Sequence, residues 1–128
     1  MGDGTAIGRV RGLGSSHEGT HHWWHQRLTA GGNLVLVLWF VVSIALLPSY
    51  DWETVHAWAA QTIVAVPLIL LVANTFYHFR LGLQVVIEDY QHDETRVVLL
   101  VLLNFFTIGA ATTAIFAILK TAFTAGAI

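Results

Sequence analysis

The stretch LTAGGNLVLVLWFVVSIALLPSY, residues 28–50, contains no charged side chain. A transmembrane helix needs about 20 apolar residues to cross a hydrocarbon core of about 30 Å, so this stretch is long enough for one crossing. Its apolar part is too long for a signal peptide, and its end offers no small-residue cleavage site. The stretch therefore predicts a retained membrane-spanning helix.

Two further stretches have the same character. Residues 97–119 contain no charged side chain, and residues 54–79 contain no Asp, Glu, Lys or Arg but include His56 and His78. The composition agrees, because 55% of the chain is apolar and 11% is charged, against about 25% charged residues in a typical soluble domain. The sequence therefore predicts an all-α membrane protein with three transmembrane helices.

Turn residues and composition set the expected boundaries. Residues 1–20 are rich in Gly and Ser without an apolar period, which is typical of a flexible tail. Residues 21–128 are expected to form one transmembrane domain. Its helices are expected at roughly 24–47, 54–90 and 95–121.

The second expected helix is the longest. Its apolar segment would span roughly 50 Å at 1.5 Å per residue, which exceeds the bilayer core. It should therefore tilt or project beyond the membrane. Pro67 in its interior favours a kink.

Small and polar residues within the apolar stretches indicate how the helices pack. Asn33, Ser43 and Asn104 are expected to form hydrogen bonds between helices. The run GAATTA, residues 109–114, contains side chains small enough to let two helices approach closely.

Loop charges indicate the orientation. Arg9, Arg11 and Arg27 precede the first expected helix, whereas the loop after it contains Asp51 and no Lys or Arg. Cytoplasmic loops carry an excess of Lys and Arg, so the N-terminus is expected on the cytoplasmic or matrix side. Three crossings would place the 88–96 loop on that same side and the C-terminus opposite.

His78 is a candidate cofactor ligand, because an ionisable group inside a membrane usually faces a bundle interior, a cofactor or a water-filled cavity. An imidazole nitrogen can ligate haem iron, and Gly82 would let a flat macrocycle lie close to the backbone. Arg80 or Arg27 could pair with haem propionates. The alternative is that His78 only hydrogen-bonds a neighbouring helix, and the residues alone do not decide between the two.

Asp89 and Tyr90 are candidates for a quinone site. Asp89 lies about three helical turns after His78, so the two side chains should share a face roughly 16 Å apart along the axis. The phenol of Tyr90 could donate a hydrogen bond to a quinone carbonyl while the carboxylate orients it or passes protons. The alternative is an ordinary solvated helix end.

Other metal chemistry has weaker support. The chain has no cysteine, which excludes disulfides, thiolate metal sites and cysteine-ligated iron–sulfur clusters. Histidines four residues apart on a helix could chelate a transition metal, although histidines beside tryptophans at a membrane interface are the commoner explanation. The histidines concerned are His17, His21, His22 and His25.

The stretch YHFRLGLQVVIEDYQH, residues 77–92, resembles the second-helix motif of the small hydrophobic membrane-anchor protein of succinate dehydrogenase (complex II). The family pattern is a histidine followed by a glycine four residues on, an aspartate eleven on and a tyrosine twelve on. His78, Gly82, Asp89 and Tyr90 occupy these positions. Three helices and a chain of this size are also similar to that family.

The resemblance implies a role for each matching residue. His78 would be one axial ligand of haem b, with the second histidine supplied by the partner anchor subunit. Tyr90 would hydrogen-bond ubiquinone where the anchor meets the iron–sulfur subunit, with Asp89 adjacent.

A second stretch, HWWHQRLTA at residues 22–30, resembles the family's approach to its first helix. The resemblance implies that Arg27 lies near a haem propionate. It also implies that Trp23 or Trp24 lies near the quinone pocket.

The resemblance further implies partners and a location. Succinate oxidation would occur on a flavoprotein subunit and an iron–sulfur subunit, so no catalytic residue is expected in this chain. The chain would pack with a second membrane-anchor (cytochrome b) subunit into a helical bundle. The lipid bilayer would be the bacterial inner (cytoplasmic) membrane or the mitochondrial inner membrane, and no nucleic acid is expected.

Two alternatives stay open at this point. One is a haem-b anchor of a fumarate reductase or another membrane dehydrogenase, because a sequence does not fix the direction of catalysis. The other is a small non-redox membrane protein in which His78 and Arg80 line a polar path.

Overall fold

The computed structural model describes residues 5–7 and 19–124, and none of these residues is in a strand. Its helices are α2 (Gly19–Ala45), α3 (Trp52–Ala60), α4 (Thr62–Tyr90) and α5 (Asp93–Thr124). Each of α2, α4 and α5 is long and apolar enough to cross a membrane. The prediction of an all-α chain with three membrane-spanning helices is therefore confirmed.

Part of the sequence lies outside the described residues. Most of the expected tail over residues 1–20 falls there, together with Arg9, Arg11 and His17. The flexibility of this tail stays a prediction.

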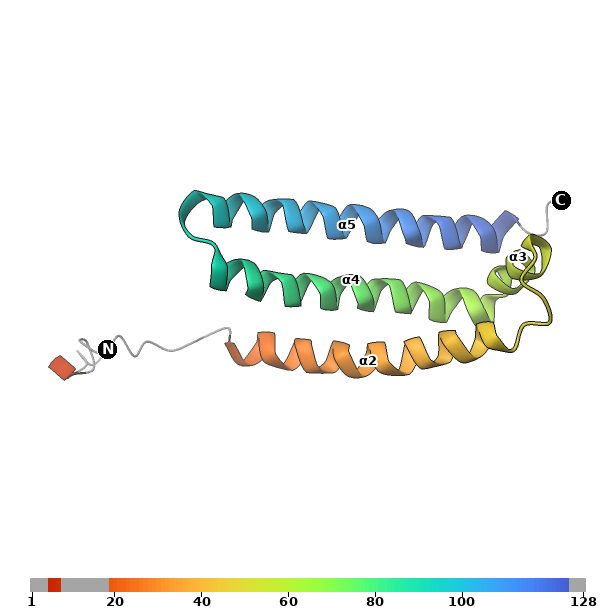
Figure 1. The fold of residues 1–128 in the computed structure, drawn as a ribbon, viewed down its shortest axis with the longest axis horizontal. Coiled ribbons are helices and arrows are strands. Elements are labelled where there is room, and N and C mark those ends of the chain that lie inside the picture. Colours follow the sequence, from red (N-terminus) through yellow and green to blue (C-terminus); the bar gives the residue numbers. More distant parts are fainter. Residues whose placement is uncertain (1–4, 8–18, 125–128) are drawn as a thin grey trace.

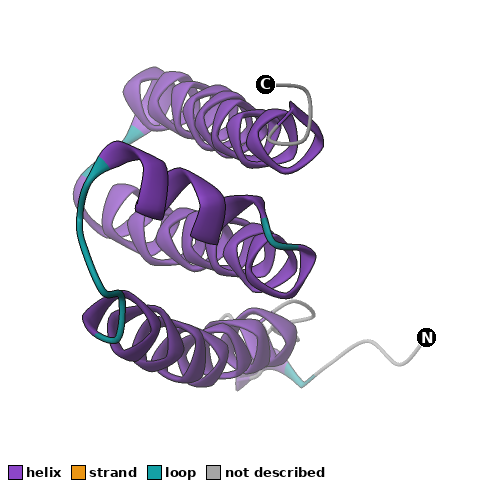
Figure 2. Cartoon of the chain, turned by 90° about the vertical axis from the view of Figure 1, so that its right-hand side faces the viewer, coloured by secondary structure: helices purple, strands orange, loops and turns teal. Residues whose placement is uncertain are grey.

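The three long helices form a single layer in which α4 lies between α2 and α5 (Figure 1). α4 packs against both neighbours, whereas the backbones of α2 and α5 do not approach each other within the described part of the chain. Seen from its end, the layer is one helix thick, and α3 lies across that end (Figure 2). Both broad faces of the layer are therefore open.

The open faces leave a small core. Large apolar side chains are exposed on every spanning helix, for example Leu34 (64%), Ile63 (79%) and Phe105 (75%). Such side chains suit a membrane protein, because lipid tails or a partner helix can cover them. The buried residues of the described part are Thr29, Val64, Ala65, Leu81, Ile87, Leu103 and Thr107.

The second apolar segment, expected as one helix over residues 54–90, is instead two helices that meet at Gln61. Gln61 has φ −67° and ψ 131°, an extended conformation that ends α3 and precedes α4. A single helix of this length would exceed a bilayer core of about 30 Å. Because of the break at Gln61, the first part of the segment, α3, lies across the end of the layer and only α4 spans it. α4 continues through Pro67, so the chain changes direction before this proline.

Local contacts hold α3 in place. Asp51 is its N-cap, and the Asp51 side chain accepts a hydrogen bond of 2.8 Å from the Thr54 backbone N–H. The indole Nε1 of Trp58 donates to Ser43 Oγ on α2 at 3.0 Å. The prediction that Ser43 bonds between helices is confirmed.

The ends of the helices lie in two groups, one at each end of the layer. The start of α2, the end of α4 and the start of α5 lie together, and α3 lies at the opposite end with the end of α5 (Figure 1). This arrangement agrees with three crossings in which the 88–96 loop shares an end with the start of α2. Asp93, the first residue of α5, has φ 55°, a left-handed conformation that aspartate tolerates.

Candidate functional site

A set of hydrogen bonds joins α2 to α4, and we call its four residues, Thr29, Asn33, Asn74 and His78, the polar seam. The Asn74 amide Nδ2 donates to the Thr29 carbonyl and to Asn33 Oδ1, both at 2.8 Å. Thr29 Oγ1 lies 2.9 Å from Nδ1 of His78. On each helix the two members are four residues apart, so they share one face.

The geometry around Thr29 assigns the proton on the His78 ring. The Thr29 hydroxyl lies 2.6 Å from the His25 carbonyl oxygen, to which it donates its single hydrogen. It must therefore accept from His78, and Nδ1 of the neutral imidazole carries the hydrogen. Nε2 of His78 then has a free lone pair and is the nitrogen available to a metal.

A glycine lets α4 approach α2 at the polar seam. A Cβ placed on Gly32 would lie 3.1 Å from Nδ2 of Asn74, closer than side chains normally come. The absence of a side chain at Gly32 therefore leaves the room that Asn74 uses to reach the α2 backbone.

Gly82 also faces α2. A Cβ placed on it would lie 3.5 Å from Nε2 of Gln26, which is ordinary van der Waals contact. Two buried polar atoms of α2, Gln26 Oε1 and His22 Nε2, have no hydrogen-bond partner among the described residues. Buried polar atoms normally have partners, so this part of α2 has unused hydrogen-bonding capacity close to Gly82.

The seam is extended toward the start of α2 by one more pair. The Tyr77 hydroxyl lies 2.9 Å from Nδ1 of His25. His25, Thr29 and Asn33 are spaced four residues apart, so α2 presents a continuous polar face to α4 over two turns.

Asp89 and Tyr90 lie at the end of α4 and are both exposed, Tyr90 at 76%. The nearby polar side chains contact the neighbouring Glu88 instead. Glu88 accepts a hydrogen bond of 3.0 Å from Gln84 and lies 3.9 Å from the Arg96 guanidinium. Within the described part of the chain, the side chains of Asp89 and Tyr90 have no hydrogen-bond partner and are available to a ligand or to another subunit.

The start of α2 carries the tryptophans. Trp23 and Trp24 pack edge to face, with ring centroids 5.3 Å apart. The Arg27 guanidinium lies over Trp23, 4.5 Å from the ring centroid, in a cation–π contact. These residues lie at the same end of the layer as the end of α4 (Figure 1).

Neither of the two arginines expected to pair with haem propionates contacts His78 within the described part of the chain. Arg80 follows His78 by two residues, about 200° around the helix, and its Nε donates to Asn104 Oδ1 on α5. Arg27 precedes Thr29 by two residues, so it lies on the other side of α2 from the polar seam. The prediction that Asn33 and Asn104 bond between helices is confirmed.

No group of three or more His, Asp or Glu side chains that could hold a metal ion occurs among residues 5–7 and 19–124. His21, His22 and His25 therefore do not form a chelating cluster by themselves. His17 lies outside these residues.

Sequence reasoning missed the role of Thr29 and Asn74. A signal for both is present, because Thr29 and Asn33, like Asn74 and His78, are polar pairs four residues apart in otherwise apolar stretches. Two polar pairs on two adjacent helices predict a hydrogen-bonded contact between those helices.

Known proteins similar to this chain share one description. The family model for the succinate dehydrogenase/fumarate reductase transmembrane subunit matches residues 1–123. The succinate dehydrogenase hydrophobic membrane anchor subunit of Rickettsia bellii (strain RML369-C) is 32% identical over 103 residues, which is 80% of this chain and 82% of the relative. The protein of that name from Paracoccus denitrificans is 32% identical over 87 residues, 68% of this chain and 67% of the relative. No solved structure matches the chain.

Proposed function

The chain belongs to the succinate dehydrogenase/fumarate reductase transmembrane subunit family, and from this premise we propose that it is the hydrophobic membrane anchor of a succinate dehydrogenase complex. Its three spanning helices make it a multi-pass membrane protein. In this role the chain holds the flavoprotein and iron–sulfur subunits at the membrane and forms part of the site at which electrons pass to ubiquinone. Succinate oxidation belongs to the soluble subunits.

The haem part of this proposal assigns His78 as an axial ligand of haem b, shared with a histidine of the partner anchor subunit. The observation that carries it is the hydrogen bond from His78 Nδ1 to Thr29, which leaves Nε2 free as the ligating nitrogen. Metal-ligating histidines almost always donate their other ring N–H to a partner that fixes the tautomer and the ring orientation. His78 and its hydrogen bond to Thr29 therefore suit ligation of a haem iron.

Other residues of this chain would serve the same group. When bound, the haem supplies a one-electron redox centre whose potential depends on its ligands and surroundings. Arg27 is exposed, so its charge would be available to a propionate that extends beyond the polar seam. Gln26, whose buried Oε1 has no partner in the described part of the chain, would accept a hydrogen bond from a group placed beside Gly82.

The quinone part of the proposal rests on Tyr90 and Asp89. Their side chains are exposed at the end of α4 and make no hydrogen bond to other described residues. Tyr90 would donate its phenolic hydrogen to a quinone carbonyl, and Asp89 would orient it or pass protons. Trp23 or Trp24 would line the same pocket.

The open faces of the layer support the partner part of the proposal. Because the backbones of α2 and α5 do not approach each other in the described part of the chain and large apolar side chains are exposed on both, this chain does not enclose a cofactor alone. A second anchor subunit against one face would complete a helical bundle around His78. The soluble subunits would dock at the end of the layer that carries Tyr90, on the cytoplasmic or matrix side of the membrane.

The test is a reduced-minus-oxidised optical spectrum of the complex, purified in mild detergent from wild type, His78→Ala and His56→Ala. His56 is the matched control, because it is a histidine of α3 at the opposite end of the layer. We expect a sharp b-type band in wild type and His56→Ala, and its loss in His78→Ala. An unchanged spectrum in His78→Ala would refute ligation, and failure of the chain to co-purify with succinate dehydrogenase activity would refute the anchor role.

A further inference from the structure

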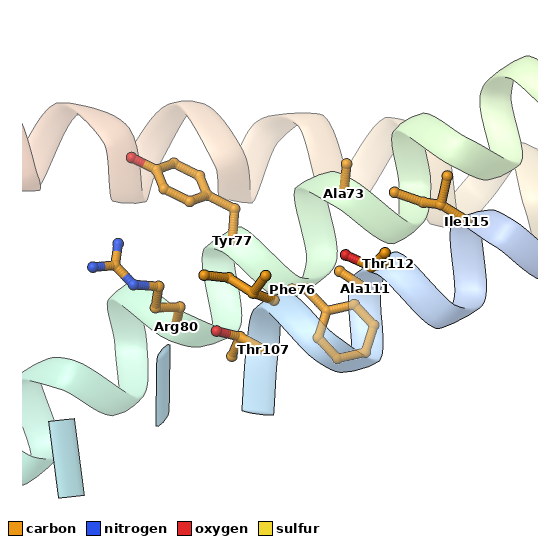
Figure 3. Close-up of a pocket in the computed structure, with 9 residues that line it drawn as sticks. Ala73, Phe76, Tyr77, Arg80, Thr107, Ala111, Thr112 and Ile115 are labelled. Carbon is orange, nitrogen blue, oxygen red and sulfur yellow. The ribbon is translucent and has the colours of Figure 1, made fainter. Parts of the chain in front are cut away.

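A groove between α4 and α5 is not used by the proposed function. It has a volume of about 280 Å³, and its lining residues come from α4 and α5 (Figure 3). Most of its lining is apolar, and its polar groups are Arg80, Tyr77 and two threonines, Thr107 and Thr112.

Small residues of α5 create this groove. Within the run 109–114, Gly109 is exposed, and a Cβ placed on it would meet no atom within 4 Å; the expectation that this run lets two helices approach closely stays a prediction. Ala111 and Thr112 of the same run line the groove. These small side chains leave space between the helices, because the facing side of α4 contributes another small residue, Ala73.

Arg80 has no acidic partner within the described part of the chain. Its Nε donates to Asn104 Oδ1, and both Nη groups are without a partner among the residues the structure describes. No Asp or Glu occurs between Glu53 and Glu88 in the sequence. A charged side chain within a membrane helix is costly and is usually paired, so an anion beside Arg80 is expected.

The groove has a charged end at Arg80 and an apolar end at Ala73 and Ile115, which matches a ligand with a charged head and an apolar tail. Arg80 is the lining residue of α4 nearest to Tyr90, and the groove extends from it to Ala73, about 10 Å further along the helix axis at 1.5 Å per residue. In Figure 3 the guanidinium points away from the apolar part of the groove, toward the end of α4 that carries Tyr90. A charged head beside Arg80 would therefore lie nearer the membrane surface than a tail beside Ala73 and Ile115.

We propose that this groove binds an anionic phospholipid, with its phosphate on Arg80 and one acyl chain between α4 and α5. A guanidinium presents paired N–H donors that match phosphate oxygens, and the two Nη groups of Arg80 supply them. Arg80 makes its contact with α5 whereas His78 contacts α2, so the lipid and a ligand of His78 would occupy different sides of α4.

The test counts the phospholipid that stays on the intact complex after extensive washing in detergent, by phosphorus analysis and mass spectrometry of extracted lipid. We expect Arg80→Gln to retain about one phospholipid fewer per copy of the chain than wild type. Lys120→Gln is the matched control, because it removes one positive charge from α5 outside the groove, and it should retain the wild-type amount. Equal retention in wild type and Arg80→Gln would overturn the proposal.

A second variant leaves Arg80 in place. Ala73→Leu fills the tail end of the groove at an exposed position, and it should also lower retention, whereas Ala117→Leu on the exposed surface of α5 should not. Full retention in Ala73→Leu would contradict the proposed tail position.

The same complexes then receive phosphatidylglycerol or phosphatidylcholine with identical acyl chains. We expect phosphatidylglycerol to raise the melting temperature of the wild-type complex more than phosphatidylcholine does, and this difference to vanish in Arg80→Gln. If Arg80→Gln instead shifted the haem potential without changing the retained lipid, the anion beside Arg80 would be a haem propionate and the lipid proposal would be wrong. These lipid readouts do not require haem ligation by His78 or quinone binding at Tyr90.

Discussion

The Thr29 hydroxyl accepts a hydrogen bond from Nδ1 of His78 across 2.9 Å while it donates to the His25 carbonyl at 2.6 Å. One oxygen atom therefore connects the α2 backbone to the imidazole on α4. Because the Thr29 hydroxyl already donates its hydrogen to the His25 carbonyl of α2, the imidazole must carry its hydrogen on Nδ1 in this contact. Packing of α2 against α4 and the chemistry of His78 are thus coupled.

Replacing Thr29 by valine keeps the shape of the side chain but removes the acceptor for His78 Nδ1. We expect Thr29→Val to weaken haem retention by about 10–100-fold, the usual effect of losing the partner of a metal-ligating histidine, and to shift the haem potential. Thr29→Ser keeps the hydroxyl and should restore both. Haem content, the optical spectrum and a redox titration measure these effects, and a Thr29→Val complex identical to wild type in all three would contradict the assigned role.

Replacing Tyr90 by phenylalanine removes one hydroxyl at the end of α4. A hydrogen bond contributes about 0.5–1.5 kcal/mol, so we expect quinone reduction by the complex to fall by about two- to tenfold. Succinate oxidation with an artificial dye and the haem content should be unchanged. Tyr50→Phe is the control, because Tyr50 is also exposed but lies in the loop before α3. Equal quinone kinetics in both variants would exclude the proposed contact.

The two adjacent glycines of α2 offer a matched pair. Both Gly31→Ala and Gly32→Ala raise helix propensity, by up to about 1 kcal/mol. A Cβ at Gly32 would lie 3.1 Å from Asn74, whereas a Cβ at Gly31 would meet no atom within 4 Å. We expect Gly31→Ala to match or exceed wild type in thermal stability in detergent. Gly32→Ala should fall below Gly31→Ala by about 1 kcal/mol, roughly the value of one hydrogen bond, and no difference between them would show that the close approach is unimportant.

The cap of α3 should respond to pH. A hydrogen bond from the Ser49 side chain, followed by those from Thr54, lowers the pKa of Asp51 from its ordinary value of 3.8 to about 2. Because the pKa is lower in the folded state, the carboxylate stabilises α3 fully above about pH 4 and loses this effect as the pH falls toward 2. Hydrogen–deuterium exchange of α3 should therefore accelerate on acidification relative to Asp51→Asn, which caps without titrating. Parallel pH dependence in wild type and Asp51→Asn would contradict this expectation.

The spanning helices could be predicted from the sequence because each is a long stretch without charge, and Asn33, Ser43 and Asn104 could be predicted as bonding residues because they are polar within such stretches. The break at Gln61 could not be placed. Gln61 is neither glycine nor proline, and the proline that does signal a disturbance, Pro67, lies within α4. The extended conformation at Gln61 is set by the way α3 packs across the layer, which is a tertiary effect.

The candidate site was predicted in part. His78 stood out as an ionisable residue in an apolar stretch, but periodicity gives only the face of a helix and not the residue that it meets. Thr29 as its partner, and the separation of Arg80 from it, depend on which neighbouring helix each face of α4 contacts. The haem and quinone roles of His78, Asp89 and Tyr90 stay predictions.

The side-by-side order of the spanning helices in the layer is the order in which they are synthesised, since α4 contacts α2 and α5 contacts α4 without reaching α2. Each helix can therefore dock on its predecessor as it leaves the ribosome, and none has to insert between two that are already in place. During this process Thr29 can satisfy its hydroxyl on its own helix through the His25 carbonyl, whereas Asn33 Oδ1 receives its hydrogen bonds from α4. Arrival of α4 is thus the step at which Asn33 obtains its polar partners in the bilayer.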